Sequence, residues 1–378
     1  MTIVVAPDKF KGSLTARQVA ERVAAGLHRF RPELEVRLAP IADGGDGTLE
    51  AVMARGYTPV PVLVSGPQGT PIEAAFVLRD RTAVVELAEA SGLRRLPPGR
   101  LNPMQASSRG TGDLIRAALD IGCDQVIIGL GGSACTDGGA GMLQALGVRL
   151  LDREGQDVGP GGAGLRSLDT VDLTGLDPRL AGTRVVLASD VDNPLLGPTG
   201  AASIYAPQKG ASVDQVAELE LGLQRWAGKL GLATDRQLAA APGAGAAGGV
   251  GFAALTVLGA ELRPGIEMIL ELIDFEELLP GASLVITGEG SLDEQSLHGK
   301  APIGVATAAT RHGVPTIAVA GRSSLSSRQL QIGGLAAAYS LTSIEPDPAV
   351  CIADAGRLLE DLVSTVVATD WLTPTHGG

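Results

Sequence analysis

The sequence has few aromatic residues and few cysteines. Aromatic side chains make up 3% of the 378 residues. The three cysteines, Cys123, Cys135 and Cys351, are scattered along the chain, which argues against a disulfide framework and for a reducing compartment. They form no CxxC pair or Cys/His cluster, so the sequence gives no support to a zinc site.

A basic stripe is also lacking. The net charge is −12 and the isoelectric point is about 4.9, which disfavours nucleic acid as a partner. A negative surface repels anionic substrates on average, so an anion site would have to be built locally. Lysine is the scarcest cation, because only five of the 30 basic residues are lysines: Lys9, Lys11, Lys209, Lys229 and Lys300.

Targeting and membrane signals are missing as well. Residues 1–7 lead into an apolar strand without a basic region, so we expect no signal peptide. The stretch 237–260 is uncharged, but it consists mainly of alanine and glycine with one proline, and a membrane span needs more lipophilic residues. We therefore expect a cytoplasmic protein without a membrane partner. The oligomeric state is left open.

What the chain does have is length, apolar residues and glycine. Hydrophobic residues make up 45%, which excludes a disordered chain, and 378 residues favour two domains. The 52 glycines have no collagen period, so they indicate tight turns and close backbone approaches.

Short apolar runs rich in valine and isoleucine alternate with helical patterns at both ends of the chain. Residues 3–6 and 35–41 read as strands, and between them Thr15 and Gln18 have the spacing of a capping box at a helix start. A short helix is expected over 48–55. This β-α-β-α order predicts a parallel sheet with right-handed crossovers.

The pattern changes near residue 60. Residues 60–64, 72–78 and 83–87 read as closely spaced strands whose turns suit antiparallel pairing. Alternation then resumes, with helices or strands expected over 111–121, 125–129, 138–146, 185–188, 213–230, 284–287, 316–320, 336–341 and 353–367. We therefore predict an α/β protein in which 1–60 and 282–378 form a doubly wound parallel-sheet domain. A larger mixed α/β domain, 61–281, is inserted into it.

The chemistry-bearing residues follow the predicted strands. In open α/β sheets, ligands bind beyond the carboxyl ends of the strands. Five strand ends carry glycine, acid or lysine, namely 7–13, 43–48, 129–139, 189–194 and 288–293. One such end is ordinary loop chemistry, but five together predict a polar cleft lined by several loops.

Phosphoryl transfer needs these groups. Glycines let backbone N–H groups approach phosphate, lysines supply point charges, and paired carboxylates suit a Mg²⁺ ion that keeps much of its water. The pairs are Asp43 with Asp46 and Asp190 with Asp192. Each piece also has an ordinary interpretation as a turn or helix cap.

The standard nucleotide-binding motifs are mostly absent or incomplete. The pattern GxxxxGK[ST] is absent, and Gly243, Gly245 and Gly248 match GxGxxG without the preceding strand or the later acid of a Rossmann unit. These glycines could still begin an anion-binding apolar helix. The stretch GLGGSA at 129–134 is similar to the phosphate loop of galactokinase-type kinases.

Four of the five lysines, all except Lys229, stand in the motif loops. Since arginine serves as the general surface cation, the retained lysines indicate places that need a compact ammonium group. We expect Lys229, on a plain helix, to be dispensable.

In combination, these motifs resemble the bacterial glycerate kinase family, type I. The matching stretches keep the family order: APDKFKGSL (6–14), DGGDGT (43–48), GLGGSA (129–134), DGGAG (137–141), SDVDNPL (189–195), GAA (200–202), PQKGA (207–211), PGAGAAGGVG (242–251), LRPGI (262–266), ITGEG (286–290) and GKAP (299–302). The resemblance implies a flavodoxin-like domain with an inserted second domain. It also implies ATP-dependent phosphorylation of D-glycerate with Mg²⁺ in an inter-domain cleft, with 2-phosphoglycerate as the usual product.

The sequence departs from the family pattern at a few positions. Lys9 stands where serine is common, Asp46 where glutamate is common, and Cys135-Thr136 where a Thr-Asn pair is common. Ser291 stands where arginine is common, so this strand end has lost a cation.

From loop position and chemistry we expect Asp190 to be the catalytic base or a metal ligand, with Asp192, Glu289 and Asp293 as further metal or supporting ligands. Lys11 and Lys209 should hold phosphate or the substrate carboxylate. The other candidate substrate- and nucleotide-binding residues are Asp8, Lys9, Ser13, Asp43, Gly44, Gly45, Asp46, Gly47, Thr48, Gly131, Gly132, Ser133, Asp137, Asn193, Gln208, Gly243, Gly245, Gly248 and Lys300. The alternatives are a kinase for another small hydroxy acid or sugar acid, a sugar-acid binding protein without chemistry, and a dinucleotide enzyme.

Overall fold

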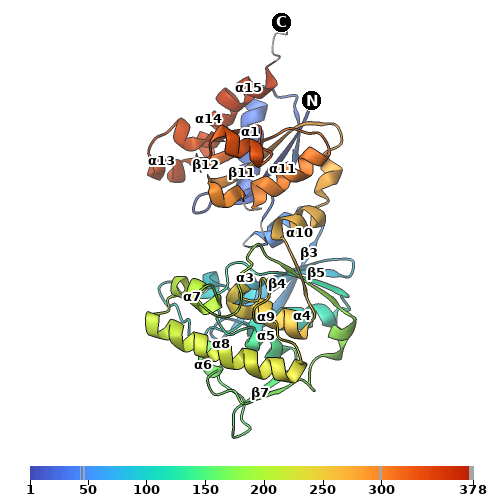
Figure 1. Cartoon of the computed structure of the whole chain (residues 1–378). Coiled ribbons are helices and arrows are strands. Elements are labelled where there is room, and N and C mark those ends of the chain that lie inside the picture. Colours follow the sequence, from blue (N-terminus) through green and yellow to red (C-terminus); the bar gives the residue numbers. More distant parts are fainter. Residues whose placement is uncertain (43, 46, 298–299, 374–378) are drawn as a thin grey trace. The chain divides into compact units, whose positions relative to one another are not determined.

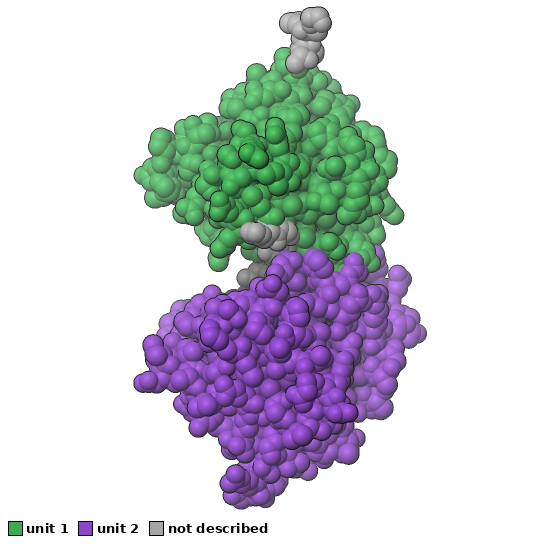
Figure 2. Space-filling model, viewed as in Figure 1, with its two compact units in different colours: residues 1–43, 50–55, 266–378 green, residues 44–49, 56–265 purple. Residues whose placement is uncertain are grey.

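The computed structural model describes residues 1–42, 44–45, 47–297 and 300–373. The chain forms two compact units, coloured green and purple in Figure 2. Unit 1 comprises residues 1–43, 50–55 and 266–378, and unit 2 comprises residues 44–49 and 56–265. Residues 266–281, which the sequence interpretation assigned to the inserted domain, belong to unit 1. The reason is packing, since a Cβ on Gly304 would lie 2.4 Å from the side chain of Ile266.

A five-stranded sheet forms the centre of unit 1 (Figure 1). Its strands are β1 (Thr2–Pro7), β2 (Glu35–Leu38), β11 (Ala282–Leu292), β12 (Thr316–Ser323) and β13 (Ala337–Ser340). The spatial order is β2-β1-β11-β12-β13, and every neighbouring pair is parallel. This is the 2-1-3-4-5 order of flavodoxin-like sheets. The predicted doubly wound α/β fold is confirmed.

Unit 1 also contains helices, some of which cover the two faces of this sheet. They are α1 (Ala16–Phe30), α2 (Thr48–Met53, shared with unit 2), α10 (Gly265–Leu272, of which Gly265 belongs to unit 2), α11 (Ala301–Arg311), α12 (Ser327–Ile332), α13 (Pro348–Ala353), α14 (Ala355–Leu362) and α15 (Ala368–Leu372). Along β12, Ile317 and Val319 join a buried cluster with α1 and α14, whereas Ala318 and Ala320 join one with α11 and α12. The alternation follows from the two-residue period of a strand.

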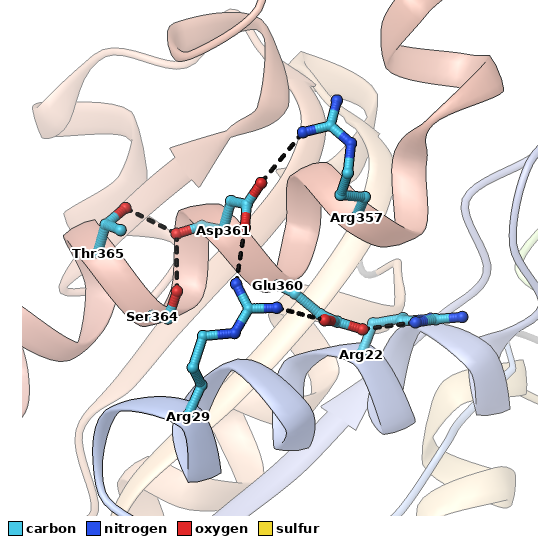
Figure 3. Close-up of polar contacts among 7 residues, drawn as sticks. All are labelled: Arg22, Arg29, Arg357, Glu360, Asp361, Ser364 and Thr365. Carbon is cyan, nitrogen blue, oxygen red and sulfur yellow. Dashed lines mark hydrogen bonds and ion pairs between the residues drawn. The ribbon is translucent and has the colours of Figure 1, made fainter.

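Helix α1 begins with the predicted capping box of Thr15 and Gln18. Its partner α14 continues into a π-helical turn, so the single helix expected over 353–367 is divided. Figure 3 shows the ion pairs that join the two helices, with Arg29 bonded to Glu360 and to Asp361, both at 2.7 Å. Arg22, Arg357, Ser364 and Thr365 complete this surface network, which joins helices and not strand ends.

Unit 2 is built on a six-stranded mixed sheet. Its strands are β3 (Thr58–Ser65), β4 (Pro71–Arg79), β5 (Thr82–Glu86), β6 (Gln125–Gly129), β9 (Arg184–Ala188) and β10 (Glu261–Arg263), in the order β10-β9-β6-β5-β4-β3. The pairs β3–β4 and β4–β5 are antiparallel as predicted, and the other pairs are parallel. The sequence missed β10 and the small hairpin of β7 (Arg149–Leu151) with β8 (Thr170–Asp172), because three-residue strands carry too little pattern.

The helices of unit 2 pack around one large aliphatic core. They are α3 (Leu87–Ser91), α4 (Arg109–Asp120), α5 (Ala140–Ala145), α6 (Gly161–Gly164), α7 (Ala201–Tyr205), α8 (Val213–Thr234) and α9 (Ala246–Val257). The uncharged stretch near residue 250 forms α9, most of which is buried. Within the described part of the chain, none of the helices has the length and apolar character to cross a membrane.

Candidate functional site

In unit 1 the polar groups gather at the carboxyl ends of β1, β11 and β12. After β1, Asp8 is buried, and one of its carboxylate oxygens accepts a hydrogen bond from the Lys9 backbone N–H at 2.7 Å. The Ser13 hydroxyl donates to the Phe10 carbonyl at 3.1 Å. Lys11 is exposed. Of the predicted residues in this loop, Lys11 therefore presents a cation to solvent, while Asp8 and Ser13 shape the loop.

The expected loop at 288–293 is a strand for most of its length. β11 continues to Leu292 because its end pairs with the end of β12, with Ser291 opposite Arg322 and Leu292 opposite Ser323. The prediction that 288–292 is a loop was therefore wrong. Gly290 allows a close approach there, since a Cβ on it would lie 3.1 Å from the Lys11 backbone nitrogen. Lys11 therefore lies against the end of β11.

Glu289 and Lys300, both predicted site residues, lie together in unit 1. One Glu289 oxygen accepts a hydrogen bond from the Ser296 hydroxyl at 2.8 Å, and the other is 3.4 Å from the Lys300 Nζ. Burial raises the pKa of Glu289, partly offset by these two partners. Asp293 accepts a hydrogen bond from the Gln295 N–H at 3.0 Å, and its other oxygen is 3.5 Å from the Ser291 hydroxyl.

Arg322 belongs to this group although the sequence analysis missed it. Its Nε donates to the Ser291 hydroxyl at 3.0 Å, and the side chain is exposed. The strand end that lacks a cation at position 291 therefore has a guanidinium from the neighbouring strand. One signal was available: Arg322 follows the apolar run of β12, so it is itself a strand-end residue.

In unit 2, Lys209 is buried to 2% exposure on a short 3-10 turn, Pro207–Lys209. Its Nζ donates to the Ser133 hydroxyl at 2.9 Å and to the Cys135 carbonyl at 2.5 Å. Burial lowers the pKa of Lys209, and the nearby Asp137 acts in the opposite direction. The ammonium group therefore holds the loop that follows β6, and its neighbour Gln208 is exposed.

Asp137 is the second group that holds this loop. It is fully buried, and its Oδ2 accepts hydrogen bonds from the Ser108 N–H at 2.8 Å, the Ser108 hydroxyl at 2.9 Å and the Gly141 N–H at 3.2 Å. Its Oδ1 accepts from the Gly139 N–H at 3.1 Å. These donors satisfy a buried carboxylate, so the structure gives Asp137 a positioning role inside unit 2.

Several predicted glycines lie against other backbone segments. A Cβ on Gly131 would lie 2.4 Å from the Gly45 Cα, and one on Gly44 would lie 2.9 Å from the Ala188 carbonyl oxygen. Gly132 lies in the left-handed region at φ 72°. The segment that precedes α2 therefore packs on the ends of β6 and β9. Glycine is therefore needed at positions 44 and 131 for close packing of the backbone.

The glycines of the GxGxxG-like stretch, Gly243, Gly245 and Gly248, also pack closely against neighbouring segments. The Gly245 N–H donates to the Asn193 carbonyl at 2.8 Å, and Gly248 has φ 69°. A Cβ on Gly248 would lie 2.1 Å from the Cys135 carbonyl oxygen, and one on Gly243 would lie 2.5 Å from the Leu262 side chain. The first turn of α9 is therefore distorted and packed on the loop after β6.

The loop after β9 presents carboxylates. Asp190 and Asp192 are exposed, and an Asp190 oxygen accepts a hydrogen bond from the Gly265 N–H at 2.8 Å, at the start of α10. The Asn193 amide donates to the Thr199 carbonyl at 2.8 Å. Burial, and secondarily the charge of Asp192, raise the pKa of Tyr205.

The start of α2 contacts a carboxylate that the sequence analysis did not select, because the Leu49 N–H donates to an oxygen of Glu86 at 3.4 Å. Gly47 lies just before α2, and the Thr48 hydroxyl donates to the Gly45 carbonyl at 2.7 Å. The buried Glu86, last residue of β5, is 2.9 Å from an Arg94 nitrogen. Asp43 and Asp46, predicted binding residues, lie outside the described residues.

The side chains available as ligands fit a Mg²⁺ ion that is bound mainly by nucleotide phosphates and water. Across the described ranges, no three acidic, histidine or cysteine side chains cluster as a metal site. Mg²⁺ bound with a nucleotide commonly uses only one or two protein carboxylates together with phosphate oxygens and water. Asp192, exposed in the loop after β9, matches this pattern, whereas both oxygens of Glu289 already contact protein groups, Ser296 and Lys300.

The fold and these groups define an α/β protein of two units, each with cationic and acidic side chains at the carboxyl edge of a sheet that contains parallel strands. Comparison with known sequences narrows the class. A model of the glycerate kinase family matches residues 3–370. The chain belongs to this family.

Individual relatives support the same family assignment. The chain is 46% identical over 344 residues to a glycerate kinase of Bacillus subtilis strain 168, covering 90% of each chain. It is 45% identical over 324 residues to glycerate 2-kinase of Escherichia coli K12, covering 85% of each. A crystal structure from Salmonella typhimurium LT2, described as that of a candidate glycerate kinase 2, matches with a TM-score of 0.83 and 42% identity over 98% of both chains.

Proposed function

We propose that this protein transfers the γ-phosphoryl group of ATP to D-glycerate and that the product is 2-phosphoglycerate. The observation that carries the proposal most directly is the loop after β6 in unit 2, held by Lys209 and Asp137 within the unit that also exposes Asp190. Family membership across residues 3–370 and relatives named glycerate kinase support the choice of substrate.

In this proposal, the 2-hydroxyl oxygen of D-glycerate attacks the γ-phosphorus. A new P–O bond forms, the bond between the γ-phosphorus and the β–γ bridging oxygen breaks, and ADP leaves. The hydroxyl proton passes to the Asp190 carboxylate, which is exposed and oriented by the Gly265 N–H. Phosphoryl transfer depends mainly on positioning and charge stabilisation, so a rigid loop and placed cations are what it requires.

Asp192 would hold Mg²⁺ together with the nucleotide phosphates, and the ion would neutralise charge that develops on them. Asp190 is assigned the proton and not the metal, because a carboxylate bound to Mg²⁺ is a poor proton acceptor. Lys11, exposed at the end of β1, would contact phosphate or the glycerate carboxylate. Gly131, Gly132 and Ser133 would present backbone and hydroxyl groups to phosphate. Lys209 would act mainly through Ser133, because two of its three N–H donors already bond inside the unit.

The test is an ADP-release assay with ATP, Mg²⁺ and a set of small acceptors: D-glycerate, L-glycerate, glycolate, D-lactate, glycerol and a six-carbon sugar acid. We expect D-glycerate to give the highest kcat/KM, by at least about tenfold, or about 1.4 kcal/mol. Higher kcat/KM with the sugar acid would overturn the substrate assignment. ATP binding without ADP release on any acceptor would favour a binding protein instead.

A further inference from the structure

Arg322 occupies a position that sequence motifs do not mark. It is on β12 one residue beyond Gly321, opposite Ser291 in the parallel register with β11. Its Nε donates to the Ser291 hydroxyl at 3.0 Å, which orients the guanidinium at the carboxyl edge of the sheet. Ligands of open parallel sheets bind at this edge.

The charged side chains near Arg322 do not explain why an arginine stands at this position. Within the part of the chain that the structure describes, no carboxylate lies within ion-pair distance of its guanidinium. Glu289 contacts Lys300 and Ser296, and the Asp293 carboxylate contacts the Gln295 N–H and the Ser291 hydroxyl. Most arginines of unit 1 are ion-paired, among them Arg22, Arg29, Arg37, Arg311 and Arg357.

The backbone beside Arg322 brings a second cationic residue, Lys11, close to this edge. A Cβ on Gly321 would lie 2.6 Å from the Gly290 carbonyl oxygen, and a Cβ on Gly290 would lie 3.1 Å from the Lys11 backbone nitrogen. The end of β1, the end of β11 and the end of β12 therefore meet closely, with Lys11 and Arg322 both exposed.

We propose that Arg322 is an oxyanion-binding residue, which holds a carboxylate or phosphate group of one of the two substrates at the carboxyl edge of the unit 1 sheet. The planar guanidinium suits bidentate contact with either group. This inference rests on the proposed function for the identity of the ligands, D-glycerate and ATP.

The experiment compares wild type with Arg322→Ala, Ser291→Ala and Arg328→Ala. Ser291→Ala removes the orienting hydrogen bond but keeps the guanidinium, and Arg328→Ala removes another exposed arginine of the same unit, on α12. Calorimetric titrations with ATP alone and with D-glycerate alone are measured beside the KM for each substrate. Thermal melting reports on the fold.

We expect Arg322→Ala to weaken one ligand about tenfold or more in Kd and KM, with a smaller loss for Ser291→Ala and none for Arg328→Ala. Loss confined to D-glycerate identifies a carboxylate site, and loss confined to ATP identifies a phosphate site. Unchanged Kd and KM values for both ligands, or a lowered melting temperature as the sole effect, would overturn the proposal.

Failure of the proposed function gives a different result. A wild-type protein that binds ATP but phosphorylates no D-glycerate refutes that function, while the ATP titration of Arg322→Ala still tests the arginine. An active wild type with an unaffected Arg322→Ala variant refutes only the role of the arginine.

Discussion

The Nζ of Lys209 lies 2.9 Å from the Ser133 hydroxyl, and both groups are buried. A lysine is buried at this depth only when its ammonium group is well bonded, because desolvation of the charge is costly. Lys209 joins the short turn after α7 to the loop after β6, so it acts on the predicted phosphate loop through Ser133 and Cys135.

We predict that Lys209→Met lowers kcat about 100-fold, because a misplaced loop costs roughly that much in a positioning-dependent reaction. Lys209→Arg should also be impaired, since the larger group must be forced into a filled site at about 1–3 kcal/mol. Steady-state kinetics and urea unfolding measure the two effects. Lys229→Met is the matched control, because Lys229 pairs with Asp169 at the surface, and it should retain wild-type activity. An active Lys209→Met enzyme would refute the positioning role.

Asp190→Asn should keep the fold and lose activity. The amide oxygen of asparagine can still accept the hydrogen bond from the Gly265 N–H, so the start of α10 is retained. We expect kcat to fall by more than about tenfold, or about 1.4 kcal/mol, with an unchanged circular dichroism spectrum. Asp157→Asn, another exposed carboxylate of unit 2, is the control. Turnover within tenfold of wild type would leave Asp190 as a helix-capping residue only.

Lys11 tests the idea that a compact ammonium group is required. Lys11 is exposed at the end of β1, beside Gly290. Lys11→Arg should be nearly as damaging as Lys11→Ala, because a planar fork presents its charge in a different geometry. The measurement is kcat/KM for both substrates, with Arg17→Ala on α1 as the control. Full activity of Lys11→Arg would contradict the requirement.

Glu289 should give stability a specific pH dependence. Its pKa in the folded protein is raised by burial above the ordinary value of 4.5. Below 4.5 the carboxyl is protonated in both the folded and the unfolded state. Above the raised pKa it is ionised in both, and burial then disfavours the folded state. The free energy of unfolding that Glu289 contributes therefore falls as pH rises from 4.5 through the raised value.

Urea unfolding of wild type and Glu289→Gln from pH 4.5 to pH 8, without divalent metal, measures this contribution. The stability of the Gln variant relative to wild type should rise with pH across that interval and then level off. A constant difference would show that the pKa of Glu289 is not raised. If Glu289 is a metal ligand, added Mg²⁺ should stabilise wild type more than the variant at pH 8. Equal stabilisation would leave the metal to other carboxylates.

The architecture was largely predictable from sequence because aliphatic periodicity and strand–helix alternation are strong signals. The strand over 125–129 and the antiparallel run after residue 60 follow directly from them. The extent of β11 was not predictable, because Gly288 and Gly290 look like loop residues in sequence. Gly288 lies in a strand because it pairs with Val319 of β12. Gly290 lies between two residues that also pair with β12, Glu289 and Ser291, and the backbone of Lys11 approaches it closely.

The residue types of the candidate site were predictable from the sequence, but the contacts that these residues make were not. Loop position selected Lys209 and Asp137, but only packing reveals that both are buried and bonded within unit 2. The sequence did not distinguish Arg322 from other arginines, because arginine is the common surface cation of this chain. Its contact with Ser291 depends on strand register.

The most direct test of the account is the product formed by the wild-type protein from ATP and D-glycerate in the presence of Mg²⁺. Proton and phosphorus NMR of the reaction mixture identifies the phosphorylated carbon while ADP is quantified in the same sample. We predict 2-phosphoglycerate and ADP in equal amounts. Formation of 3-phosphoglycerate would contradict the assigned position of transfer, and ADP without a phosphorylated glycerate would contradict the proposed function itself.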